Sequence, residues 1–430
     1  MKFLHAADIH LDSPMQVAAR REGAPVDALR GCTRRAFAAM VDLALAERVA
    51  FVVIAGDLYD GSWKDYGTGL FFAEQMGRLG EVPCFVALGN HDAESVITRG
   101  LQLTLPRNVH LFPAKRPETV VLRDLGVALH GRSFPERAVT EDISAAYGAP
   151  VPGLVNIGVL HTAADGRPGH EPYAPCTVAG LVGRGYDYWA LGHVHQHEVL
   201  ARHPDPWIVF PGNLQGRSAR EAGPKGCLLV EVEGDRLVPE RRAVDVLRWA
   251  ELAVPADGAA SLAELAARVR DRVADAAAAA EGRPLAVRLA ITGETALQGE
   301  LLSRPDRLEA ECRAAAAEAA PAAWIERVRL ATQGPATQGL ATQGLATQGP
   351  AAAAAGVDAL SRLLASFPEA LAEPAVRQAL LGEAAAILGR FPAEPEDAEI
   401  RALATEESLP GIVEAARALV AHRLAGRRPA

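Results

Sequence analysis

Short apolar runs that end in a polar residue recur along the first 250 residues. Five of these runs lead into Asp8, Asp57, Asn90, His161 and His193. Helical patterns separate them, which is typical of alternating α and β layers, and two later runs at 207–210 and 226–232 predict strands that complete the sheet. Because ligands gather beyond the carboxyl ends of strands in open α/β sheets, the five polar residues predict one convergent site.

The pattern changes after residue 250. Helical periodicity near 262–280 precedes a strand-like run at 285–292, and a second helical stretch near 301–319 precedes another at 324–331. This α-β-α-β order predicts a small separate domain over 251–330.

A pentapeptide repeat follows, with ATQG recurring four times over 331–350 before an alanine run. Four short polar repeats cannot build a solenoid, so we expect a low-complexity linker over 331–356. Helical patterns return over 357–430, and the last one, near 411–424, ends in the basic sequence GRRPA. We expect this helical tail to dock onto a partner.

Composition limits the class of protein. The 430-residue chain carries a net charge of −9, which does not indicate a generally basic nucleic-acid-binding surface. No apolar run reaches the ~18 residues of a membrane span, and MKFLHAADIH resembles a first strand more than a signal peptide. Five cysteines occur singly, without a CxxC pair, which favours a reducing cytoplasm.

Short motifs at the strand ends supply metal-binding chemistry. They are DIH at 8–10, GDLYD at 56–60, GNHD at 89–92, a lone His161 and GHVH at 192–195. Residues two apart on an extended segment point the same way, so Asp8 can act with His10, and His193 with His195. Imidazole and carboxylate ligands without thiolate suit manganese, iron or zinc. The motifs together predict a binuclear site, in which Asp57 is the natural bridge between two ions.

The predicted site could bind a phosphate even though the chain is acidic overall. Only two of its candidate ligands are carboxylates, whereas two divalent ions contribute four positive charges, which leaves about +2 for a bound phosphate. The seven candidate ligands are Asp8, His10, Asp57, Asn90, His161, His193 and His195.

These motifs resemble those of the calcineurin-like metallophosphoesterases. HAADIHLDSP, VIAGDLYDG, ALGNHD, DYWALGHVHQHE and PGNLQGRSARE are similar to the DNA-repair exonuclease branch, of the SbcD and YhaO type. The resemblance covers the chain closely to about residue 245. It implies an α/β fold, a four-layer α/β/β/α sandwich over 1–250, with a small α+β capping domain and a helical C-terminal tail.

The resemblance also implies roles for individual residues. One metal would be held by Asp8, His10, Asp57 and His195, and the other by Asp57, Asn90, His161 and His193. His91 matches the catalytic histidine of the family, which is not a ligand. Manganese is the expected metal, with iron, zinc and magnesium left open.

The implied function is a metal-dependent DNA nuclease in repair or recombination, in which a metal-activated water hydrolyses a phosphodiester. DNA, an SMC-like coiled-coil ABC ATPase and a second copy of the chain are the implied partners. GDLYDGS lacks the arginine of the protein-phosphatase motif, which weakens that interpretation. Asp60 stands where nuclease relatives tend to carry a histidine, so no role transfers to it.

Two other functions remain open on the sequence. The site also suits a small-molecule or cyclic-nucleotide phosphodiesterase, and a non-catalytic scaffold could keep the fold without the chemistry. Arg217, Arg220 and Lys225 form a basic cluster after the last strand-end motif. They are either part of a solvated loop or contacts for DNA phosphates beside the metals.

Overall fold

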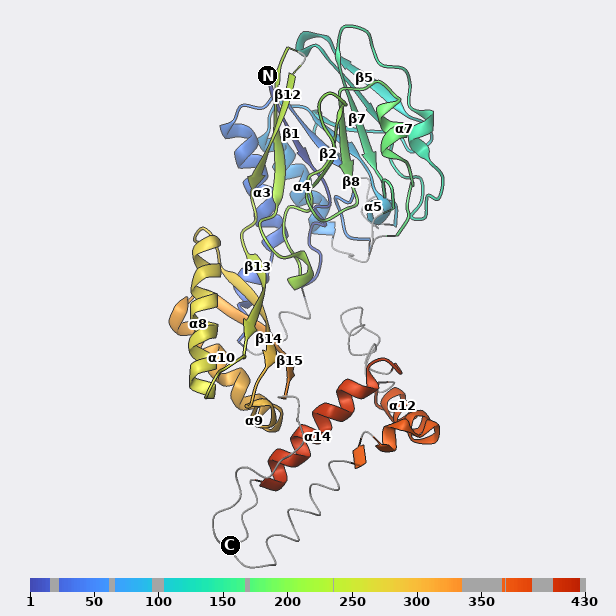
Figure 1. Cartoon of the computed structure of the whole chain (residues 1–430). Helices are drawn as coiled ribbons and strands as arrows, with labels where there is room; N and C mark the ends of the chain where they lie inside the picture. Colours follow the sequence, from blue (N-terminus) through green and yellow to red (C-terminus); the bar gives the residue numbers. More distant parts are fainter. Residues whose placement is uncertain are drawn as a thin grey trace, which may run out of the picture. The chain divides into compact units, whose positions relative to one another are not determined.

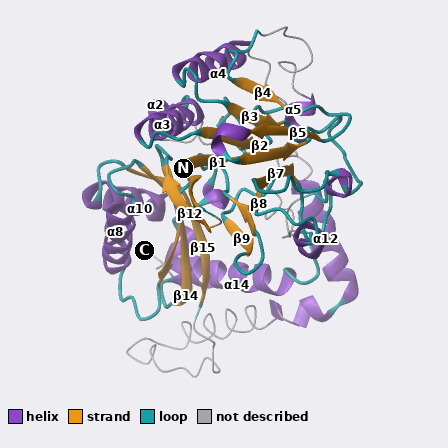
Figure 2. Cartoon of the chain, turned by 90° about the horizontal axis from the view of Figure 1, so that it is seen from above, coloured by secondary structure: helices purple, strands orange, loops and turns teal. Residues whose placement is uncertain are grey.

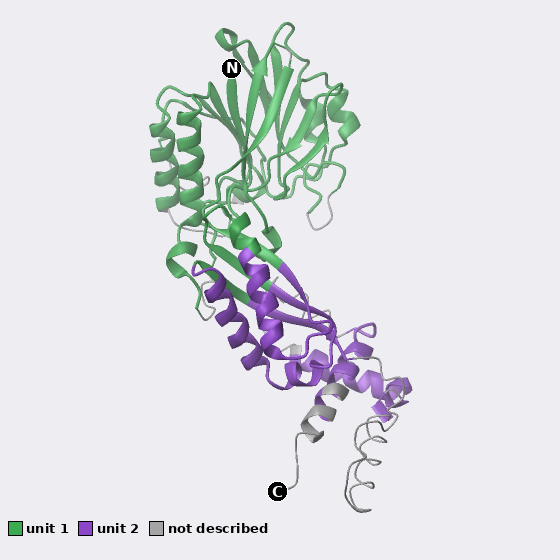
Figure 3. Ribbon diagram, turned by 60° about the vertical axis from the view of Figure 1, so that its left-hand side comes forward, with its two compact units in different colours: residues 1–251, 275–288, 322–326 green, residues 252–274, 289–321, 327–430 purple. Residues whose placement is uncertain are grey.

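The computed structural model describes residues 1–15, 23–61, 66–94, 104–166, 171–234, 236–334, 366–367, 369–388 and 405–425. Most of the ATQG repeat and part of the predicted helical tail lie outside these residues. Two compact units form: unit 1 comprises 1–251, 275–288 and 322–326, and unit 2 comprises 252–274, 289–321 and 327–430 (Figure 3).

Unit 1 contains two six-stranded sheets packed face to face (Figure 1). The first has the order β12-β11-β1-β2-β3-β4, and its strands β1 to β4 run parallel. Its strands are β1 (Lys2–Ala6), β2 (Phe51–Ala55), β3 (Cys84–Ala87), β4 (Val109–Leu111), β11 (Gly226–Glu233) and β12 (Arg236–Ala243).

The second sheet has the order β5-β6-β7-β8-β10-β9, in which β6, β7, β8 and β10 run parallel and the two edge strands run antiparallel. Its strands are β5 (Glu118–Leu122), β6 (Val127–Gly131), β7 (Val155–His161), β8 (Tyr188–Gly192), β9 (Glu198–Ala201) and β10 (Trp207–Phe210).

Both faces of the central strands are buried, which explains their continuous apolar runs. In β1, Phe3 packs into the core between the sheets while Leu4 packs into the core beneath helices α3 and α4. Trp189 of β8 is fully buried on the outer face of the second sheet, under α7, as its apolar neighbours predict. The helices of unit 1 are α2 (Val26–Leu29), α3 (Cys32–Ala46), α4 (Tyr66–Arg78), α5 (Asn90–Glu94) and α7 (Val178–Val182). The resulting α/β/β/α layers confirm the predicted fold class (Figure 2).

The region after residue 250 contains a three-stranded sheet of order β13-β14-β15 and helices beside it. Its elements are β13 (Arg248–Pro255), α8 (Leu262–Ala279), β14 (Leu285–Glu294), α9 (Gln298–Ser303), α10 (Pro305–Ala319) and β15 (Ala323–Gln333). The described part of the tail includes helices α12 (Pro374–Leu388) and α14 (Leu409–Ala425), and α14 contacts α9.

Two details differ from the sequence prediction. The single helix expected at 301–319 is two helices, because Pro305 lacks an amide hydrogen and starts α10 rather than continuing α9. Strand β15 continues through Gln333, so the first three residues of the repeat belong to a strand and not to a linker. Among the described helices, none is both long enough and apolar enough to cross a lipid bilayer.

Candidate metal centre

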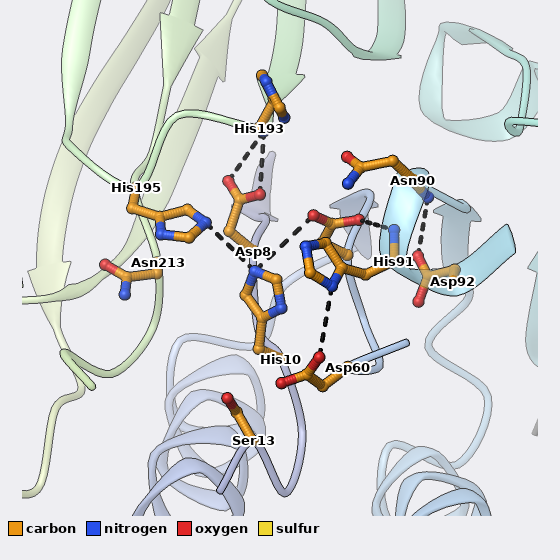
Figure 4. A network of polar contacts seen from close by, with 12 residues as sticks. Asp8, His10, Ser13, Asp60, Asn90, His91, Asp92, His193, His195 and Asn213 are labelled. Carbon is orange, nitrogen blue, oxygen red and sulfur yellow. Dashed lines mark hydrogen bonds and ion pairs between the residues drawn. The ribbon is translucent and has the colours of Figure 1, made fainter. Parts of the chain in front are cut away.

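The seven predicted ligands meet at the carboxyl ends of strands from both sheets. Asp8 and His10 follow β1, Asp57 follows β2, and Asn90 follows β3 as the first residue of α5. His161 ends β7, while His193 and His195 follow β8. Figure 4 shows the labelled members of this group pointing toward one another. Six of the seven are almost entirely buried, and His195 is partly exposed.

Tight backbone turns bring the two first-sheet motifs together. Asp8, His10 and Asp57 all have positive φ angles, between 46° and 50°. The amide of Asp8 donates to Gly56 O at 3.0 Å, and the amide of His10 donates to Asp57 O at 2.9 Å. The Asp8 carboxylate accepts the His193 amide at 3.0 Å, which ties the first sheet to the second. These backbone hydrogen bonds therefore hold the two motifs together independently of a metal.

Donor atoms converge on Asp57. Its Oδ2 lies 3.5 Å from His161 Nε2 and 3.8 Å from His10 Nε2, between histidines from the two sheets. His161 Nε2 is also 2.9 Å from Asn90 Oδ1, and His10 Nε2 is 3.2 Å from His195 Nε2. Two groups bring ligand atoms within 4.8 Å of one another: Asp8, His10 and His195; and Asp8, Asp57 and His161.

Hydrogen bonds at the far ring nitrogens set the histidine tautomers. His161 Nδ1 donates to Ala55 O at 3.0 Å, and His193 Nε2 donates to Glu171 O at 2.9 Å. Carbonyl oxygens only accept, so these nitrogens carry the protons and the opposite ring nitrogens are left as lone pairs. A metal-ligating histidine is held in this way by its second nitrogen.

The donor set fits cations. The His161 lone pair at Nε2 faces two oxygen atoms, those of Asn90 and Asp57, and a lone pair against an oxygen acceptor is unfavourable without a cation between them. His10 Nδ1 is buried and has no hydrogen-bond partner among the described residues. The arrangement of nitrogen and oxygen donors without thiolate suits two divalent ions.

Burial and charge shift the pKa values of the carboxyl and imidazole groups in different directions. Burial, and then the charge of Asp57, raises the pKa of Asp8 well above its usual range, so a cation must displace a proton to bind there. Burial lowers the pKa of His161 and that of His10, and the charge of Arg217 adds to the effect at His10. The lowered pKa values of these two histidines favour the neutral rings, whose lone pairs are available to a cation.

His91 lies beside this cluster and is partnered by Asp60, a residue to which the sequence analysis assigned no role. His91 Nδ1 is 3.4 Å from Asp60 Oδ1, and the His91 ring meets the His10 ring edge-on at 4.8 Å. Burial alone would lower the pKa of His91, but the hydrogen bond with Asp60 and the charges of Asp57 and Asp60 raise it. The side chain of His91 is 35% exposed, so a substrate can reach it.

The sequence leaves two roles open for Asp92, that of a helix cap and that of a group that orients His91, and in the structure its carboxyl group positions two backbone turns. It is fully buried and accepts from the amides of Leu58, Tyr59 and Gly89, which joins the Asp57 turn to the Asn90 turn. Burial and the charge of Asp57 raise the pKa of Asp92 to about 7. Gly89 belongs to the same GNHD motif as Asp92, but Leu58 and Tyr59 lie more than 30 residues away, and no local pattern identifies them as partners.

Gly89 shows how closely these turns approach. A Cβ atom at this position would lie 2.4 Å from Asp57 Oδ1 and 2.8 Å from the Asp57 amide nitrogen. Only glycine leaves room for the Asp57 carboxylate.

The predicted basic cluster needs correction at Lys225. Lys225 is 2% exposed, and its Nζ donates to His195 O at 2.8 Å, so it supports the GHVH turn and is not presented to DNA at the surface. Arg217 is partly buried beside the centre, where it pairs with Glu221 at 3.0 Å. Of the three residues, Arg220 is exposed.

Comparison with known proteins agrees with this geometry. The calcineurin-like phosphoesterase pattern matches residues 1–197, and the pattern of the middle domain of the metallophosphoesterase YhaO matches residues 249–333. The uncharacterised metallophosphoesterase YhaO of Bacillus subtilis (strain 168) is 36% identical over 300 residues, which cover 68% of this chain and 72% of the relative.

Two archaeal DNA double-strand break repair proteins, both called Mre11, are also similar. The one from Methanopyrus kandleri is 27% identical over 56% of this chain and 52% of its own length. The one from Haloferax volcanii is 26% identical over 63% of this chain and 58% of its own length. This chain thus spans a little over half the length of each Mre11 relative. Calcineurin-like phosphoesterases use two divalent metals, as the donor cluster requires. By its sequence and its metal-binding geometry, the chain belongs to the YhaO family of calcineurin-like metallophosphoesterases.

Proposed function

We propose that this protein is a metal-dependent DNA nuclease that acts in repair or recombination. The observation that carries the proposal is the convergence of lone pairs from both sheets on Asp57, beside a partly exposed His91. Phosphoester hydrolysis follows from the family, and DNA as the substrate is supported by the similarity to the two Mre11 repair proteins.

In this proposal two Mn²⁺ ions occupy the centre. When bound, two divalent ions lower the pKa of a water molecule and neutralise the charge of the phosphate. One ion is held by Asp8, His10, Asp57 and His195, and the other by Asp57, Asn90, His161 and His193.

His91 supplies the proton chemistry. Its Nδ1 is held by Asp60, which leaves Nε2 to donate a proton to the leaving oxygen of the scissile phosphodiester. The raised pKa of His91 favours the protonated ring, which is the form that a general acid needs. Asp60 keeps the ring oriented and compensates its positive charge.

Substrate and partner contacts lie outside the metal centre. Arg217 and Arg220 are proposed to contact DNA phosphates, and the region 251–330 to act as the capping domain that selects DNA ends. The helical region 357–430 is proposed to dock on the coiled-coil base of an SMC-like ABC ATPase, and the chain to act as a homodimer in the cytoplasm.

The test is hydrolysis by the purified full chain in Mn²⁺. Linear duplex DNA, single-stranded DNA, cyclic nucleotides and bis-p-nitrophenyl phosphate are compared as substrates. We expect nucleotide release from DNA, and loss of that activity together with one metal in Asn90→Ala and His193→Ala. Hydrolysis of the small diesters with DNA untouched would favour the alternative phosphodiesterase. A wild-type protein without a stoichiometric metal pair would be the non-catalytic scaffold.

His91→Ala separates catalysis from metal binding. We expect this variant to keep both metals while turnover falls by about 10²- to 10⁴-fold, the usual contribution of a general acid. His110→Ala is the control, since His110 pairs with Glu118 on strands β4 and β5, at 2.9 Å. Loss of metal in His91→Ala, measured by elemental analysis after gel filtration, would contradict the role given to His91.

A further inference from the structure

A buried hydrogen-bond network surrounds Glu221, between β10 and β11. Glu221 Oε1 accepts from His195 Nδ1 at 2.7 Å and from the Arg217 guanidinium at 3.0 Å. Glu221 Oε2 accepts from Asn213 Nδ2 at 2.8 Å and from the Arg217 amide at 2.7 Å. Four donors thus fix both oxygens of one carboxylate, which leaves it little rotational freedom.

The bond to His195 has a defined direction. Glu221 as a carboxylate only accepts, so the proton of the neutral imidazole is at Nδ1. The lone pair of His195 is then at Nε2, the atom that lies 3.2 Å from His10 Nε2 within the donor cluster. With the opposite tautomer, Nδ1 could accept from the Arg217 guanidinium at 3.2 Å, but it would also lie 2.7 Å from a carboxylate oxygen with no proton between them, which is unfavourable.

The same segment also holds the backbone of His195. His195 O accepts from Lys225 Nζ at 2.8 Å and from the backbone amide of Asn213 at 3.3 Å. Both ends of His195 are therefore fixed by residues 213–225, which the predicted ligand motifs do not include.

We propose that Glu221 is a positioning residue of the metal centre, which holds His195 so that Nε2 can bind a cation. The proposal rests on the proposed metal-dependent function. It assigns to the GRSARE sequence a role in metal affinity, in addition to the phosphate contact proposed for Arg217.

The test is Mn²⁺ binding, measured apart from DNA cleavage. Titration calorimetry gives stoichiometry and affinity, and electron paramagnetic resonance distinguishes a coupled Mn²⁺ pair from single ions. In Glu221→Gln, an NH₂ group replaces one carboxylate oxygen. Its hydrogens would face donor groups from which the Glu221 carboxylate now accepts hydrogen bonds. We expect the affinity of one site to fall by about 10- to 100-fold, as when other partners of metal-ligating histidines are removed, and the coupled-pair signal to weaken.

A double-mutant cycle shows whether the effect passes through His195. His195→Ala should lower the affinity of the same site, and Glu221→Gln should add little in the His195→Ala background. Glu326→Gln is the matched control, because Glu326 is buried and, like Glu221, is paired with an arginine, Arg288, at 2.9 Å. We expect that control to bind two Mn²⁺ ions as the wild type does.

Two outcomes would overturn the proposal: an unchanged Mn²⁺ affinity in Glu221→Gln, or equal losses in Glu221→Gln and Glu326→Gln. If Glu221→Gln does not fold, Glu221→Asp is tested instead, since it keeps the charge but shortens the side chain by one methylene. An unchanged Mn²⁺ affinity in Glu221→Asp would then overturn the proposal. A wild-type protein that binds two Mn²⁺ ions without cutting DNA would refute the nuclease and leave the role of Glu221 standing.

Discussion

His5 is a fully buried histidine whose protonation is coupled to folding. Its Nδ1 lies 3.0 Å from the Tyr188 hydroxyl and its Nε2 lies 3.1 Å from Leu191 O. Burial lowers the pKa of His5 to about 3, against 6.5 for an exposed histidine. Between these values the unfolded chain binds a proton that the folded chain does not, so the free energy of unfolding falls as the pH falls.

This coupling predicts a measurable difference between the wild type and His5→Gln. The penalty is absent above about pH 6.5, grows by up to about 1.4 kcal/mol per pH unit below it, and levels off near pH 3. Glutamine does not titrate, so the stability of the wild type relative to His5→Gln should decrease between pH 6.5 and 4.5. Urea unfolding at pH 7.5, 5.5 and 4.5 measures this difference. Parallel pH profiles for the two proteins would contradict it.

At the residue scale, the sequence predicted the groups that sit in motifs and missed those that act over long separations. Asp8 and His10 are found because they form a short motif at a strand end, although the expected extended segment is a turn in which both residues have positive φ angles. Glu221 and Asp60 are recognisable only once the chain has brought them to His195 and His91. The carbonyl of Glu171, which holds His193, leaves no signature in the side-chain sequence at all.

At the scale of elements, a buried ion pair connects the start of β13 to the segment between α8 and β14. The Asp245 side chain is fully buried and accepts from Arg248 at 3.0 and 3.1 Å, while Arg283 lies 3.1 Å from it. Arg248 also donates to Ala279 O at 2.8 Å. These contacts hold two segments more than 30 residues apart in register.

Asp245→Ala should therefore be strongly destabilising. Removing Asp245 leaves the buried Arg248 with the exposed Glu281 as its acidic partner, and breaking a buried pair typically costs about 3–5 kcal/mol. The control is Glu318→Ala, which removes an exposed partner of Arg270 at 3.6 Å and should change the unfolding midpoint little. Chemical denaturation compares the two variants. A similar midpoint for both would show that the Asp245 network does not support the fold.

The helices and strands were predicted correctly where hydrophobic periodicity is strong. They were predicted incorrectly where a single residue or a strand pairing sets the end of an element. The buried strands of both sheets follow from their apolar runs. The division of one expected helix into α9 and α10 depends on Pro305 alone. The extra length of β15 depends on pairing within its sheet, which the polar sequence ATQ does not predict.

At the scale of the whole molecule, the metal centre belongs entirely to unit 1. All seven predicted ligands lie within 1–251, and so do four of the five tryptophans; the fifth, Trp324, is in the 322–326 segment of the same unit. Tryptophan fluorescence therefore follows the unfolding of unit 1 alone. Any effect of metal on stability should appear in that signal, whichever order the two units unfold in.

Without metal, the carboxyl groups of Asp8 and Asp57 are buried beside each other, and the charge of Asp57 raises the pKa of Asp8. We expect Mn²⁺ at about 100 times its dissociation constant to stabilise unit 1 by about 2.7 kcal/mol per ion. For a domain of this size that corresponds to a rise in the fluorescence-detected Tm of about 5–10 °C for the first ion. In Asp57→Asn we expect a much smaller Tm rise in Mn²⁺ than in the wild type, because the carboxylate proposed to join the two ions is gone. A Tm rise of equal size in both proteins would mean that Mn²⁺ stabilises the chain at some other place, and that Asp57 does not join the two metals.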